Sequence, residues 1–138
     1  MMVLSDVSGK SMRPLIADED VEQRRFVEKS FTTLGYFRTV TAGCFDEMIS
    51  LTHYSPVLFD RFDLLVVNSD IFYSCEFDYL DFCLGNSRLK HVLIYDLNKG
   101  SSAVEVLSER SGEQVWRVQN VTSDVIARLI PLIDSRAF

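Results

Sequence analysis

The chain has 138 residues, of which 47% are hydrophobic and 25% are charged, and its formal net charge is −6. This length predicts one domain, and the composition excludes an intrinsically disordered chain. Because lysine and arginine are scattered along an acidic chain, direct binding to nucleic acid has little electrostatic support.

Three cysteines without a C-x-x-C pair favour reduced thiols in a cytoplasmic protein over a disulfide framework. The first 13 residues contain no apolar stretch long enough for a signal peptide or a membrane span. We therefore expect residues 1–12 to form a flexible leader, residues 13–138 to form a single domain, and the protein not to associate with a membrane.

The regular structure is predicted to begin with a strand and a helix. Residues 14–17 form a short apolar run that ends at an acidic cluster. Apolar residues then recur at helical spacing from Val21 to Leu34 and stop at Gly35, a residue type that commonly ends helices. Asp20 stands at the start of this helix, where its side-chain oxygen would cap the first backbone N–H groups.

The rest of the chain continues the alternation of strand and helix. The predicted strands are residues 37–42, 62–67, 92–95 and 115–118, and the predicted helices are residues 45–52, 76–84 and 103–109, with a last helix from 122 or 123 to about Pro131. Residues 62–67 are apolar almost throughout, as expected for a parallel strand buried on both faces. Five alternating strands and helices predict a parallel sheet with helices on both faces.

Polar side chains follow several of these strands. In a parallel α/β sheet, ligands bind beyond the carboxyl ends of the strands, so residues at these ends are expected to share one crevice. They are Asp18, Glu19, Asn68, Asp96 and Gln119. Three carboxylates and an amide oxygen would suit a hard cation such as Mg²⁺ or Ca²⁺, with Asp18 and Glu19 as its ligands.

Four segments carry a resemblance to a known family: Leu15–Asp20, Gln23–Arg25, Leu34–Tyr36 and Phe62–Val67. Together they resemble the receiver domain of bacterial two-component response regulators, and the match runs over residues 13–133. The resemblance implies a three-layer, doubly wound (βα)5 flavodoxin-like fold with five parallel strands in the order 2-1-3-4-5. It also implies a magnesium ion on an acidic pair, a phosphoryl group on an aspartate after the third strand, and an aromatic rotamer switch on the fifth strand.

The chain departs from that pattern at most of the reactive positions. Asp18 and Glu19 match the acidic pair, and Trp116 occupies the switch position. Asn68 replaces the phospho-accepting aspartate, and Asp96 replaces a serine or threonine. Gln119 and Asn120 replace a lysine and a proline. An amide oxygen is a far weaker nucleophile than a carboxylate and gives no acyl phosphate. A carboxylate at position 96 would repel a phosphate, because like charges about 4 Å apart cost about 4 kcal/mol at an effective dielectric of 20.

We therefore expect a degenerate receiver, or pseudo-receiver, that performs no catalysis, needs no cofactor and acts in two-component-type signalling as a phosphorylation-independent interaction module. Its protein partner, or a second copy of the chain, would bind through the fourth helix, fifth strand and fifth helix. The residues expected there are Val104, Val106, Leu107, Trp116, Val125 and Leu132.

Two other hypotheses remain at this point. In a haloacid-dehalogenase-like phosphatase, Asp18 would be the nucleophile, Asp20 the general acid, and Asp18 and Asp96 would hold the metal. A conventional receiver would instead be phosphorylated at another acid, for which Asp70 is the candidate. Asp96 also has a structural interpretation, in which Lys99 pairs with it, and the indole of Trp116 is expected to pack in the interior.

Overall fold

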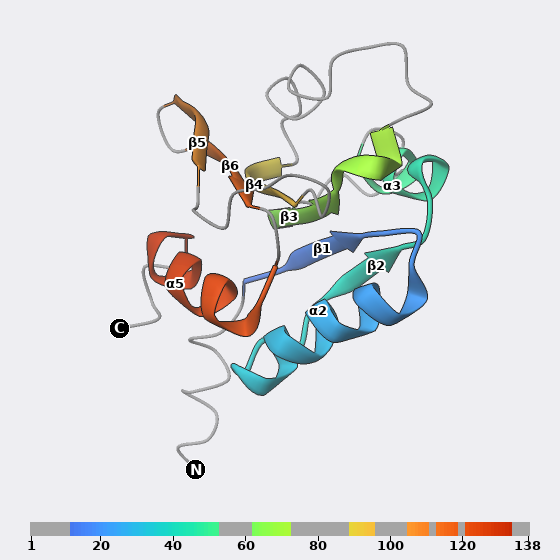
Figure 1. The fold of residues 1–138 in the computed structure, drawn as a ribbon, viewed down its shortest axis with the longest axis horizontal. Helices are drawn as coiled ribbons and strands as arrows, with labels where there is room; N and C mark the ends of the chain where they lie inside the picture. Colours follow the sequence, from blue (N-terminus) through green and yellow to red (C-terminus); the bar gives the residue numbers. More distant parts are fainter. Residues whose placement is uncertain are drawn as a thin grey trace.

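Six strands form one sheet in the order β2-β1-β3-β4-β6-β5, with helices on both faces (Figure 1). The structure is a computed structural model, and it describes residues 12–52, 62–72, 89–95, 105–110, 113–118 and 121–133. The elements, in chain order, are β1 (Pro14–Ala17), α2 (Val21–Thr33), β2 (Val40–Ala42), α3 (Phe45–Thr52), β3 (Phe62–Asn68), the short 3₁₀ helix η1 (Ser69–Phe72), β4 (Leu89–Tyr95), β5 (Glu105–Arg110), β6 (Glu113–Val118) and α5 (Ser123–Ile133).

The five parallel strands confirm the predicted flavodoxin-like topology. β1 pairs in parallel with β2 and with β3, and β4 pairs in parallel with β3 and with β6. Counting parallel strands alone, the order is therefore 2-1-3-4-5, as the resemblance implies. The predicted bounds of β1 and α3 agree with the structure, whereas β2 is shorter than predicted and begins at Val40.

The prediction of a helix at residues 103–109 is wrong. Glu105–Arg110 form the strand β5, which pairs antiparallel with β6 at the edge of the sheet. Only Ser111 and Gly112 separate the two strands, a spacing typical of a β-hairpin. The register places Glu105 opposite Arg117. A segment this short has little helical stability of its own, so pairing with β6 decides its conformation.

Two further predictions concern helices in the second half of the chain. The predicted helix at residues 76–84 lies outside the described residues. The last helix, α5, begins at Ser123 as predicted, but it continues to Ile133 and so extends beyond Pro131. In the described part of the chain, no helix is both long enough and apolar enough to cross a membrane.

The core has two parts, one on each face of the sheet. Alternating residues of β1 divide between them: Ile16 faces α2 and α5, whereas Leu15 and Ala17 face α3. Met12, just before β1, is buried with the α2 and α5 side. On β3, the four residues 64–67 are all buried, which confirms a central strand covered on both faces.

Packing of α2 against the sheet depends on Phe31, which is fully buried. We expect Phe31→Ala to lower the free energy of unfolding by about 3–5 kcal/mol, because the substitution removes a buried ring and leaves a cavity. Phe26 on the same helix is 45% exposed, so Phe26→Ala should change the free energy of unfolding by less than about 1 kcal/mol. Urea unfolding of both variants measures the difference, and equal losses would contradict the assigned packing of α2.

Candidate functional site

The register of the sheet brings three polar side chains together at the carboxyl ends of the central strands. Asp18 directly follows β1, Asn68 is the last residue of β3, and Tyr95 is the last residue of β4. β1 and β3 are aligned up to the pair Ala17 and Val67, and Asn68 lies opposite Tyr95. The three residues therefore form one row across neighbouring strands, at the edge where the sequence predicted a crevice.

The carboxylate of Asp18 is the centre of this row. It is only 2% exposed. Its Oδ1 accepts a hydrogen bond from the backbone N–H of Asp20 at 2.8 Å, and its Oδ2 accepts one from the hydroxyl of Tyr95. The Nδ2 group of Asn68 lies 3.5 Å from Oδ1 and 3.4 Å from Oδ2. A buried carboxylate is costly unless donors surround it, and these three groups supply the donors.

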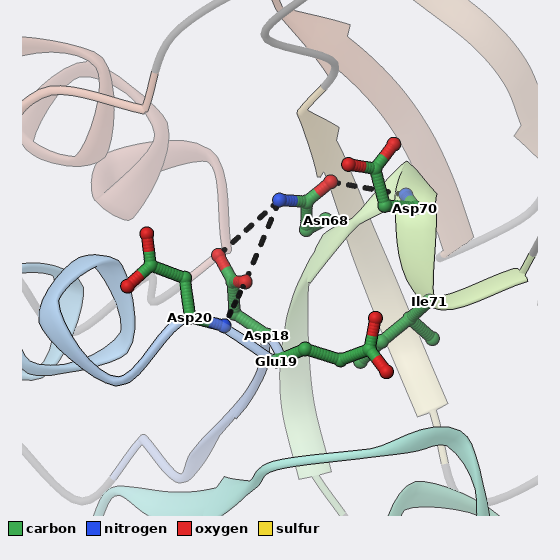
Figure 2. Close-up of a pocket in the computed structure, with 6 residues that line it drawn as sticks. All are labelled: Asp18, Glu19, Asp20, Asn68, Asp70 and Ile71. Atoms are coloured by element: carbon green, nitrogen blue, oxygen red, sulfur yellow. Dashed lines mark hydrogen bonds between the residues drawn. The ribbon is translucent and has the colours of Figure 1, made fainter.

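Asn68 uses both ends of its amide (Figure 2). While Nδ2 faces Asp18, the Oδ1 atom accepts a hydrogen bond from the backbone N–H of Asp70 at 3.0 Å. The opposite orientation would place the amide oxygen against a carboxylate and the NH₂ group against an N–H, so the neighbours fix the amide. An aspartate here would lack the donor that faces Asp18.

Sequence reasoning missed Tyr95. Its side chain is fully buried in the core that faces α2 and α5, and its hydroxyl reaches Asp18. Burial raises the pKa of the Tyr95 hydroxyl well above its ordinary value, and the hydrogen bond to Asp18 and the negative charge of Asp18 raise it further. The two-residue period of a strand could have identified Tyr95 from the sequence. This period places Tyr95 on the same face of the sheet as Leu93, and its position at the end of a strand places it at the same edge of the sheet as Asn68.

The acidic pair does not converge on one point. Asp18 points toward Asn68, whereas the side chain of Glu19 extends away from it toward Ile71 (Figure 2). Asp20 caps α2, as predicted: its Oδ1 accepts a hydrogen bond from the backbone N–H of Glu22 at 3.0 Å. A cavity of about 200 Å³ opens beside these groups. It is lined by Asp18, Glu19, Asp20, Asn68, Asp70 and Ile71.

This arrangement does not fit the divalent cation that the resemblance implies. Both oxygens of Asp18 already accept hydrogen bonds from protein groups. Within the described residues, no three side chains of histidine, cysteine, aspartate or glutamate are grouped in a way that would hold a metal. A cation at Asp18 would have to displace the amide of Asn68 or the hydroxyl of Tyr95.

One basic residue supports the tip of β1. Nη1 of Arg24, on α2, donates a hydrogen bond to the backbone oxygen of Asp18 at 2.7 Å. The backbone N–H of Asp18 donates to the carbonyl oxygen of Ala42, at the end of β2, at 3.1 Å. The backbone at Asp18 is thus held from both sides, which fixes where its carboxylate points.

The remaining predicted site residues divide into two groups. Asp96, Gln119, Asn120 and Lys99 lie outside the described residues. Trp116 is 2% exposed and stacks on His91, with ring centroids 5.6 Å apart and an angle of 25° between the planes. The indole is therefore a packing residue, as expected for so large a side chain in a close-packed interior.

Replacing Asn68 by aspartate tests the role of its amide. We expect Asn68→Asp to lower the free energy of unfolding at neutral pH by about 2–4 kcal/mol, because it removes a donor and adds a second carboxylate beside the buried Asp18. Chemical denaturation measures the change. Asp70→Asn, a charge change at the rim of the same cavity, should have an effect of less than about 1 kcal/mol and serves as the control. An Asn68→Asp variant as stable as the original chain would contradict the assigned network.

The raised pKa of Tyr95 predicts a dependence of stability on alkaline pH. Above about pH 10, the unfolded chain loses the tyrosine proton while the folded protein keeps it, so this residue lowers the free energy of unfolding by up to about 1.4 kcal/mol per pH unit. Tyr95→Phe lacks this contribution. The difference in free energy of unfolding between the two proteins should therefore shrink between about pH 9 and about pH 11, and denaturation curves that keep a constant difference would contradict it.

Comparison with known proteins gives a likeness in fold. No protein-family model matches the chain, and no curated protein matches it. A response regulator receiver domain protein from Bacillus halodurans C-125 superimposes with a TM-score of 0.56 at 18% sequence identity, over 91% of this chain and 97% of that one. A putative pilus assembly-related protein from Burkholderia pseudomallei K96243 superimposes with a TM-score of 0.54 at 15% identity, over 93% of this chain and 92% of that one. The chain therefore has the fold of a receiver domain.

Proposed function

We propose that this chain is a pseudo-receiver of two-component-type signalling, which binds a protein partner and is not phosphorylated. The observation that carries the proposal is the orientation of Asn68. Its amide donates toward Asp18 and accepts from Asp70, so the residue at the expected phosphoryl acceptor position is built into the site as a hydrogen-bonding group. Its amide oxygen offers no carboxylate nucleophile for a phosphoryl group.

The charge of the site supports the same proposal. Four of the six residues that line the cavity are carboxylates, and a phosphoryl donor brings further negative charge. Among the hydrogen bonds described above, the one from a basic side chain to Asp18 comes from Arg24. It goes to the backbone oxygen of Asp18. An anionic donor would thus meet mainly repulsion in this part of the chain.

We place the partner surface on α5 and the β5–β6 hairpin, at the end of the sheet where the sequence led us to expect it. This surface differs from the expected one, because the strand β5 lies where the fourth helix was predicted. Of the apolar residues expected there, Trp116 and Val125 are buried, whereas Leu132 is 61% exposed. The exposed side chain of Leu132 is therefore available for contact with another protein.

The phosphatase hypothesis has less support. It requires Asp18 as a nucleophile, yet the Asp18 carboxylate is buried and its oxygens accept hydrogen bonds from Asp20, Asn68 and Tyr95. It requires Asp20 as a general acid, yet Asp20 caps α2. Hydrolysis of p-nitrophenyl phosphate in the presence of Mg²⁺, abolished by Asp18→Asn, would favour the phosphatase instead.

A small phosphodonor tests the proposal directly. We expect no gain of a phosphoryl group by the original chain after incubation with acetyl phosphate and Mg²⁺, followed by intact-mass measurement. We expect the same result for Asn68→Asp, because restoring one carboxylate leaves the other departures from the receiver pattern in place. A conventional receiver domain treated in parallel controls for the activity of the donor.

The possible outcomes separate the hypotheses. A stable phosphorylated species of the original chain would overturn the proposal, and its loss in Asp70→Asn would identify Asp70 as the acceptor. Phosphorylation of Asn68→Asp alone would show that the rest of the site is competent and that the amide by itself blocks the reaction.

A further inference from the structure

Hydrogen-bond donors from Asp20, Asn68 and Tyr95 surround the buried carboxylate of Asp18. We propose that Tyr95 and Asn68 together replace a divalent cation at Asp18 and form a lock that joins the tips of β1, β3 and β4 without a metal. We use the name Asp18 lock for these three side chains. The inference deepens the proposed function and rests on it in one respect, namely that no metal-dependent phosphoryl transfer takes place here.

The first step concerns charge. A carboxylate that is 2% exposed needs partners for both oxygens, because burial of an unpaired charge is strongly unfavourable. Hydrogen bonds from a hydroxyl, an amide and a backbone N–H meet this need without adding a positive charge. Hydrogen bonds to an ionised acceptor are stronger than those between neutral groups, so the lock is expected to stabilise the fold.

The second step concerns space. Magnesium requires nearly octahedral oxygen ligands at about 2.0–2.1 Å, which the oxygens of Asp18 would have to provide in part. The hydroxyl hydrogen of Tyr95 and the NH₂ group of Asn68 are directed at those same oxygens. A cation would therefore be repelled by the donors or would have to displace at least one of them.

The third step concerns position. Tyr95 stands on β4, Asn68 on β3 and Asp18 at the end of β1, so the lock spans three neighbouring strands of the sheet. Tyr95 also belongs to the buried cluster that contains Trp116 and packs against α5. Loss of the hydroxyl would remove a link between the polar edge of the sheet and this cluster.

Thermal unfolding of the full chain tests the Asp18 lock in two ways. First, we compare the melting temperature in millimolar MgCl₂ with that in EDTA and NaCl at equal ionic strength, and we expect a difference of less than about 1 °C. A cation present at a hundred times its dissociation constant would raise the melting temperature by roughly 10 °C. This measurement uses the original chain and does not depend on the folding of any variant.

Second, we compare Tyr95→Phe with Tyr36→Phe, which removes a hydroxyl from another buried tyrosine of the same core. We expect Tyr95→Phe to melt roughly 5 °C or more below Tyr36→Phe, because only the first substitution removes a donor from the buried carboxylate of Asp18. A Tyr95→Phe variant that does not fold under conditions where Tyr36→Phe does would also support the lock.

Two results would overturn the inference. One is a saturable rise in melting temperature with Mg²⁺ that Asp18→Asn removes, which would make Asp18 a metal ligand. The other is a Tyr95→Phe variant that melts no lower than Tyr36→Phe. A rise with Mg²⁺ that persists in Asp18→Asn would place the ion elsewhere and support the lock. Because the proposed function is tested by phosphoryl incorporation and the lock by thermal unfolding, a failure of the one can be distinguished from a failure of the other.

Discussion

The organisation of this site depends on one buried charge, the carboxylate of Asp18. A carboxylate that is 2% exposed must be surrounded by donors, and this requirement constrains the residues beside it. The backbone of the following turn, the amide of Asn68 and the hydroxyl of Tyr95 meet it from three different segments. Asp18 is in turn held by Arg24 and by the backbone of β2, so the carboxyl ends of β1, β3 and β4 are joined at this residue.

This constraint changes the meaning of Asn68. Compared with a receiver domain, the residue first looks like the loss of a nucleophile. In the structure it is a donor to one neighbour and an acceptor for another, so an amide satisfies this position better than an aspartate would. Asn68 and Tyr95 form an alternative polar network within a fold that is otherwise retained.

Most of the fold was predictable because its signals are local and repeated. Apolar runs of four to six residues, a helical period that ends at Gly35 and strict alternation of strand and helix together define a parallel sheet. The edge of the sheet was not predictable in the same way. The segment Glu105–Arg110 is too short to have a stable conformation of its own, and pairing with β6 makes it a strand. The same holds for the end of α5, where packing of the helix on the sheet outweighs the effect of Pro131.

The sequence by itself determined the fold class and the positions of Asp18, Glu19 and Asn68 at the carboxyl ends of strands, because strand ends are local features and parallel strands share one edge. Only the tertiary structure decided how these groups are used. The pairing of Tyr95 with Asp18 joins residues that are far apart in the chain, and the direction of the Asn68 amide depends on what faces each of its ends. Hydrogen bonds depend on direction and distance in three dimensions, and a pattern of residue types contains neither.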